Sequence, residues 1–125
     1  MNPVPFAAAG RKAALVCSAA AAALLAGCAQ QAVKPLYGWD GYQPQVYDYL
    51  QGKSSHEAQI GVLEESLQTM RGKGERPPPG FHAHLGVLYA SVGKNDQASQ
   101  ELLAEKEAFP ESSPYMDFLL KNLNK

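Results

Sequence analysis

The fold is decided by residues 79–112, which read PGFHAHLGVLYASVGKNDQASQELLAEKEAFPES. Apolar residues recur there at spacings of four, three and four, on the helical face formed by Phe81, Leu85, Leu88 and Val92. Gly93 ends this stripe, and Asn95 or Asp96 is placed to cap a second helix that runs to Pro110. The stretch therefore predicts two helices joined by a short turn.

The same stretch has the 34-residue length of a tetratricopeptide repeat, which is a pair of packed helices. The positions that match the repeat, and that we take as candidate repeat-packing residues, are Leu85, Gly86, Tyr89, Ala98, Leu102 and Pro110. Small residues at Gly86 and Ala98 would let the two helices approach closely. His82 and Glu105 depart from the pattern, since the repeat usually has tryptophan and alanine there. The region resembles one such repeat.

A second apolar stripe precedes the three prolines at 77–79 and consists of Ile60, Leu63, Leu67 and Met70. Ser54 or Ser55 offers an N-cap for this helix. Residues 39–72 also carry the spacing of a degenerate first repeat, with Tyr49, Ala58 and Val62 at the offsets of Tyr89, Ala98 and Leu102.

A last stripe follows Ser112-Ser113-Pro114 and consists of Met116, Leu119, Leu120 and Leu123. It predicts a C-terminal helix that would cap the repeats. No segment alternates as a strand would. We expect an all-α fold of tetratricopeptide-like helical hairpins, with about four to five helices.

Aromatic residues concentrate in residues 37–50, YGWDGYQPQVYDYL. Glycines and Pro44 argue against a helix through the first half, whereas residues 45–51 can form two turns. Tyrosine and tryptophan suit a partner surface or a carbohydrate. The candidate partner-binding residues are Trp39, Tyr42, Tyr47 and Tyr49. The alternative is that some of them only plug one end of the helices.

The N-terminus has the three parts of a secretory signal: Arg11 and Lys12, an apolar run to Ala26, and small residues before a cut. The run is too short for a typical transmembrane helix, which needs roughly 20 apolar residues. Leu25-Ala26-Gly27-Cys28 resembles the lipobox of bacterial lipoproteins. The resemblance implies acylation of Cys28 and cleavage before it. Ala29 follows in place of the aspartate of inner-membrane lipoproteins, which favours the periplasmic face of the outer membrane.

We therefore expect a signal peptide at 1–27, a lipidated tether at 28–36 and a helical domain at 37–125 with the aromatic segment at its start. Cys17 would leave with the signal and Cys28 would carry lipid, so thiol catalysis and cysteine-based metal sites are excluded. The mature chain would have nine basic and twelve acidic residues, a net charge of −3. This balance does not favour nucleic-acid binding.

The search for a catalytic site finds few candidates. His82 and His84 are two residues apart, so on a helix they face opposite sides and cannot chelate together. We expect His82 to pack in the tryptophan-like position and His84 to be solvated. The acidic residues Glu101, Glu105 and Glu107 are expected to solvate their helix. We expect a non-enzyme without cofactor or metal, with Glu64 or His84 as the only catalytic alternatives.

Taken whole, the chain resembles a family of small proteobacterial lipoproteins defined only as a domain of unknown function. Cys28 and the PPPG turn at 77–80 carry the resemblance, with the segments 36–42, 46–49, 85–89, 109–112 and 116–120. Members of that family are typically encoded beside a lipoprotein similar to the curli secretion channel. The resemblance implies a shared envelope assembly or export complex and supplies no catalytic residues.

Two classes of function follow. The first is a membrane-anchored adaptor or accessory subunit that docks another envelope protein, such as a curli-secretion-channel-like lipoprotein, through the repeat and the aromatic segment. The alternative is a lipoprotein that binds peptidoglycan or another glycan by stacking the aromatic residues on sugars. The sequence leaves the oligomeric state open.

Overall fold

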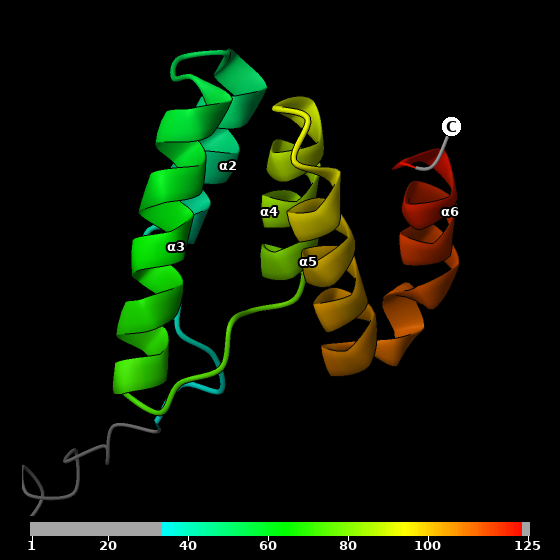
Figure 1. Cartoon of the computed structure of the whole chain (residues 1–125). Helices are drawn as coiled ribbons and strands as arrows, with labels where there is room; N and C mark the ends of the chain where they lie inside the picture. The colour runs from blue at the N-terminus through cyan, green and yellow to red at the C-terminus, as the bar shows by residue number, and fades with distance from the viewer. Residues whose placement is uncertain (1–33, 124–125) are drawn as a thin grey trace, which may run out of the picture. The chain divides into compact units, whose positions relative to one another are not determined.

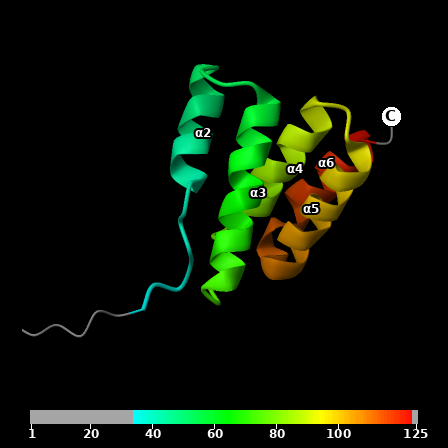
Figure 2. The ribbon, with the colours of Figure 1, turned by 60° about the vertical axis from the view of Figure 1, so that its left-hand side comes forward.

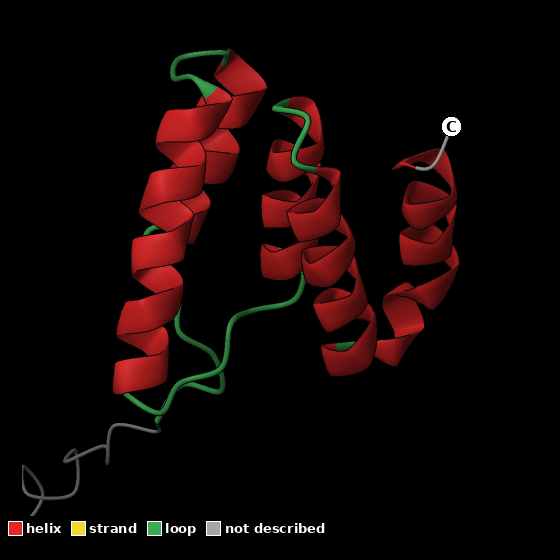
Figure 3. Ribbon diagram, viewed as in Figure 1, coloured by secondary structure: helices red, strands yellow, loops and turns green. Residues whose placement is uncertain are grey.

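Five α-helices follow one another in residues 34–123, the part of the chain that the computed structural model describes. They are α2 (Tyr42–Gln51), α3 (His56–Gly72), α4 (Phe81–Ser91), α5 (Asn95–Ala108) and α6 (Ser113–Leu123), with a 3-10 turn, η1 (Pro110–Ser112), before the last. Figure 3 shows only helices and loops in this part of the chain, which confirms the all-α fold. The predicted signal peptide, Cys28 and the tether up to residue 33 lie outside the described residues.

Each helix packs chiefly on its neighbours in the sequence, so that α2 contacts α3, α3 contacts α4, α4 contacts α5 and α5 contacts α6 (Figure 1, Figure 2). The α4–α5 pair has the most extensive contact. These helices belong to a compact unit that begins at Pro35. Within residues 34–123, no helix combines the length and the apolar character that crossing a membrane requires.

The core lies between α3, α4 and α5 and contains the apolar stripes that the sequence predicts. Its buried members are Ile60, Leu63, Leu67, Met70, Phe81, Leu85, Leu88, Tyr89 and Ala98. Phe109 and Met116 are buried further along the chain. Burying such side chains is the main stabilising term available to a domain of this size.

The helix ends agree in part with the sequence. Ser55 caps α3 as predicted, because its hydroxyl accepts a hydrogen bond from the amide of Ala58 at 3.2 Å. The predicted cap of α5 was wrong, since Lys94 holds the N-cap position and no side-chain cap bond forms within the described residues. Helix α2 begins at Tyr42, three residues earlier than expected. Pro44 fits because it lies in the first turn, where the backbone amide has no helical acceptor.

The predicted first repeat forms two helices, but they do not pack as the α4–α5 pair does. Ala98 is fully buried, whereas Ala58 at the equivalent position is exposed. Helix α2 instead begins over Val62 and Ser66, where a Cβ on Gly41 would lie 2.4 Å from Ser66 Oγ. The spacing therefore predicted a helix pair and did not predict its contact face.

Candidate functional site

The close approach of α4 and α5 depends on Gly86. A Cβ at this position would lie 3.0 Å from Leu102 Cγ and 3.2 Å from the backbone oxygen of Ala98. The neighbouring residues Leu85 and Tyr89 are buried, as is Leu102. Pro110 is exposed and begins η1, which is separated from the end of α5 by one residue. The six residues predicted to build the repeat thus lie in this hairpin or at its end.

Glu105 joins the two helices of the hairpin through its carboxylate. It accepts hydrogen bonds from the backbone amides of Gly80 at 2.7 Å and Ala83 at 3.3 Å, and its side chain is only 2% exposed. The first amides of a helix lack helical acceptors, so a carboxylate is a favourable partner there. The expectation that Glu105 solvates its helix was wrong.

The two histidines of α4 face different neighbours. His82 Nδ1 lies 2.6 Å from Glu101 Oε2 on α5, and both side chains are largely buried, so His82 packs against α5 as expected. The ring of His84 lies on the other side, with its centroid 5.1 Å from that of Tyr49 on α2 in an edge-to-face contact. The expectation that His84 is solvated was wrong, because α2 covers it.

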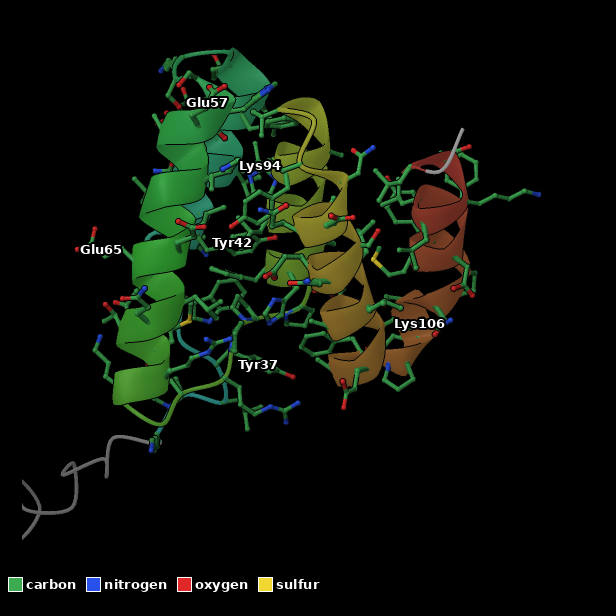
Figure 4. All side chains as sticks on the ribbon, in the orientation of Figure 1. Tyr37, Tyr42, Glu57, Glu65, Lys94 and Lys106 are labelled. Atoms are coloured by element: carbon green, nitrogen blue, oxygen red, sulfur yellow. The ribbon has the colours of Figure 1, made fainter. Side chains whose placement is uncertain are left out.

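His84 sits in an aromatic cluster that holds α2 against α4. Tyr42 contacts both His84 and Phe81, with ring centroids 6.2 Å and 5.3 Å away. Tyr42 is labelled in Figure 4, between α3 and α4 in that view. Tyr49 contacts His56 as well, at 5.8 Å. Two of the four aromatic candidates, Tyr42 and Tyr49, therefore pack between helices, which corresponds to the plug alternative for these two.

Burial perturbs the titration of this cluster. The pKa of His84 is lowered, first by desolvation and then by the nearby charge of His56. Its Nε2 atom is buried and has no hydrogen-bond partner among the described residues. The pKa of Tyr42 is raised by burial and by Glu105. Both shifts favour the neutral side chain, which fits a packing role.

The other two aromatic candidates face outward. The side chain of Trp39 is 47% exposed and packs on Tyr42 with one part of its ring system, at a centroid distance of 6.3 Å. Tyr47 is 55% exposed, with Lys53 Nζ 4.6 Å from its ring centroid. Trp39 and Tyr47 are thus the members of the set that a partner can reach.

Trp39 borders a hollow of about 370 Å³ where the N-terminal segment meets the α3–α4 linker. The lining residues are Pro35, Tyr37, Gly38, Trp39, Asp40, Lys73 and Glu75. An ion pair between Lys73 Nζ and Asp40 Oδ2, at 2.7 Å, crosses its border. Aromatic and charged groups meet in this hollow on one face of the domain.

A second hollow, which we call the α4–α6 groove, has a volume of about 330 Å³. It is lined by Gly86, Val87, Ala90, Ser91, Leu102, Leu119, Asn122 and Leu123. Small residues and aliphatic side chains make up most of this lining. The sequence reasoning did not identify it, because the gap between α4 and α6 depends on the angle at which α6 leaves η1.

Helix α6 also carries an exposed aromatic pair that the sequence reasoning missed. Tyr115 and Phe118 are each 59% exposed and stack with an interplanar angle of 14° and centroids 6.3 Å apart. Their spacing of three residues on a helix was the available signal. Leu103 on α5 is a further exposed apolar residue.

A third hollow, which is polar and has a volume of about 310 Å³, is lined by the catalytic alternative Glu64 together with Arg71 and Glu101. Glu64 Oε1 accepts a hydrogen bond from the Tyr89 hydroxyl. Burial and this bond raise the pKa of Tyr89. Across residues 34–123, no group of three or more metal-ligating side chains is close enough to hold an ion.

A family model described as a domain of unknown function (DUF4810) matches residues 36–119. The match begins at the exposed N-terminal segment and ends on α6, so it includes both Trp39 and the groove residue Leu119. Comparison with curated proteins and with solved structures gives no match.

Proposed function

The chain belongs to the DUF4810 family of domains of unknown function, and on that premise we propose that it is a membrane-anchored envelope lipoprotein that acts as an adaptor between proteins. The proposed anchor is lipid on Cys28. The proposed location is the periplasmic face of the bacterial outer membrane, since Ala29 follows the cysteine. We propose no catalytic role and no cofactor.

The main observation in support of the adaptor role is the α4–α6 groove. Its lining includes the small residues Ala90 and Ser91 beside the aliphatic side chains of Val87, Leu119 and Leu123. Such a lining suits the apolar face of a helix, a recognised way in which proteins dock. The stacked pair Tyr115 and Phe118 adds exposed aromatic surface to α6, and aromatic residues are enriched at interaction sites.

The partner that we propose is a second lipoprotein of the same membrane, similar to the curli secretion channel, with which this chain would act as an accessory subunit of an envelope assembly. This choice rests on the lipoprotein family that the sequence resembles. A partner anchored in the same leaflet gains effective concentration from the shared membrane, so that a modest groove suffices for association.

Crosslinking in intact membranes tests the adaptor role. Leu119→Glu places a charge in the groove and should abolish capture of a defined partner. Leu50→Glu is the matched control, because Leu50 is exposed on α2 and its replacement should leave capture unchanged. Since Leu119 is partly buried, Ser91→Arg provides a second groove variant at an exposed position. Equal capture by all variants would reject the groove as the docking site.

A separate experiment tests the anchor. Cys28→Ser should prevent labelling with radioactive palmitate and should leave an uncut precursor in the cell. The wild-type chain should incorporate the label and migrate as the shorter mature form. Normal cleavage of the serine variant would reject the lipoprotein assignment and would leave the groove experiment unaffected.

A further inference from the structure

The N-terminal segment of the described unit presents two apolar side chains to solvent. Leu36 is 83% exposed, and Trp39 is the only tryptophan of the chain. Both precede α2, and Trp39 lines the hollow at the α3–α4 linker. Exposed tryptophan and leucine so close together on a small domain mark a contact surface rather than a core.

This segment is held in a fixed position on the domain. The amide of Gly38 donates a hydrogen bond to the carbonyl oxygen of Arg76 at 2.9 Å. Gly38 is buried so closely that a Cβ there would lie 2.6 Å from Met70 Cγ. The ring of Tyr37 packs on that of Phe109 at 5.9 Å. Leu36 and Trp39 therefore flank residues that are anchored to the core.

The charges around these two residues nearly balance one another. Lys34, Lys73 and Arg76 are exposed beside them, and Asp40 and Glu75 supply two negative charges. Asp40 is paired with Lys73. An excess of one positive charge attracts an anionic surface only weakly, so binding depends chiefly on the apolar side chains.

We propose that Leu36 and Trp39 contact the bilayer that holds the lipid of Cys28, and that this contact orients the domain on the membrane. The inference rests on the lipid anchor proposed above. The segment that follows Cys28, residues 29–35, has seven residues and spans at most about 25 Å. Leu36 is the next residue, which makes this surface the first part of the domain that the bilayer can meet.

The chemistry of the two side chains suits a phospholipid surface. Tryptophan is enriched at membrane–water interfaces, where its ring sits at the level of the headgroups. A leucine beside it can enter the boundary of the acyl chains. Lysine and arginine stems can lie along the surface while their charges stay in water. In this orientation the α4–α6 groove stays free for a protein partner, because its residues are distinct from those of the contact surface.

The fluorescence of Trp39 tests the contact directly. The mature lipoprotein is reconstituted in vesicles of phosphatidylethanolamine and phosphatidylglycerol, with and without phospholipid brominated on its acyl chains. We expect brominated lipid to remove most of the Trp39 emission, and acrylamide to quench it less than in detergent-free buffer without lipid. Unchanged emission in brominated vesicles would overturn the proposal.

Two variants make the test specific. Leu36→Glu should weaken the quenching without affecting the fold, because Leu36 packs on little else. In the double variant Trp39→Phe/Leu50→Trp, the reporter moves to the far end of α2, where an exposed side chain at 72% should escape brominated lipid. Equal quenching at both positions would overturn the proposed orientation.

Two further measurements separate the possible failures. Flotation of the protein with vesicles reports the anchor, so a protein that floats without Trp39 quenching keeps the anchor and loses the contact. Quenching that persists without phosphatidylglycerol supports a contact made by the apolar side chains, whereas a strict need for anionic lipid contradicts it. If purified sacculi protect Trp39 from acrylamide and vesicles do not, a glycan occupies the surface and the proposal fails.

Discussion

The carboxylate of Glu105 accepts a hydrogen bond from the backbone amide of Gly80 at 2.7 Å, across the interface between α5 and the start of α4. The amide of Ala83 bonds to the other carboxylate oxygen. The repeat pattern usually has alanine where Glu105 stands. This chain instead uses the position to satisfy the amides of a helix that begins after glycine and lacks a side-chain cap among the described residues.

Replacing Glu105 with alanine should lower the free energy of unfolding by about 2–3 kcal/mol, because two amides lose a charged acceptor in a buried place. Urea denaturation followed by circular dichroism measures the change. Glu107→Ala is the control: Glu107 is exposed on the same helix, and its loss should change stability by no more than about 0.5 kcal/mol. Similar effects for the two variants would contradict the capping role.

Alanine at Gly86 should destabilise the domain by about 1–3 kcal/mol, because the new methyl group would press on Leu102 and on the backbone of Ala98. Gly61→Ala should have the opposite effect on stability. Gly61 lies within α3, and apart from its two neighbours and the nearby backbone of its own helix a Cβ there would meet no described atom within 4 Å. Alanine is the better helix former, so stability should rise by roughly 0.5–1 kcal/mol. Thermal unfolding of both variants checks this pair of predictions.

Stability should decrease as the pH falls below about 6.5, the ordinary pKa of histidine. Burial and His56 lower the pKa of His84 in the folded protein, so the unfolded chain binds a proton first. Neutral His84 contributes fully to the stability of the fold above the pKa of histidine in the unfolded chain. This contribution is lost as the pH falls through the lower pKa of His84 in the folded protein. Denaturation curves recorded at several pH values should show this loss of stability. In His84→Gln, the free energy of unfolding should depend less on pH below about 6.5. If the stability of His84→Gln depends on pH as the wild type does, the effect comes from other titrating groups.

Tyr89→Phe should lower the free energy of unfolding by about 0.5–1.5 kcal/mol, because the variant lacks the hydroxyl that donates a hydrogen bond to Glu64. The loss is limited because the exposed carboxylate of Glu64 can bind water instead. The pKa of Tyr89 is raised, chiefly by burial, so wild-type stability should also fall as the pH rises above about 10. The variant should lose part of that alkaline sensitivity. Tyr47→Phe, at an exposed ring, serves as the control and should match the wild type.

The helices could be predicted because their apolar residues recur at the helical period. The spacing from Ile60 to Met70 gave α3, and that from Phe81 to Leu88 gave α4. The contact at Gly86 and Ala98 was also readable, since only small residues allow helices to approach so closely. These features are local or belong to a repeat of known spacing.

The rest depends on contacts between segments far apart in the sequence. Glu105 is buried because the start of α4 lies over it, and His84 is covered because α2 folds back onto α4. Ala58 has the spacing of a packing residue and is exposed, because α2 meets α3 along another face. Periodicity locates a helix and its apolar side, whereas the angle between helices decides which polar residues become buried.

The bond between Gly38 and Arg76 also determines how the domain would respond to mechanical load. A pull on the chain from its N-terminal side reaches this bond and the Tyr37–Phe109 ring contact before it reaches any residue of α2. Tension would thus pass into the α3–α4 linker and the end of α5 instead of peeling α2 away from α3. Resistance to such a pull is governed by the rate at which these contacts break. The segment before α2 would therefore bear the load in place of α2.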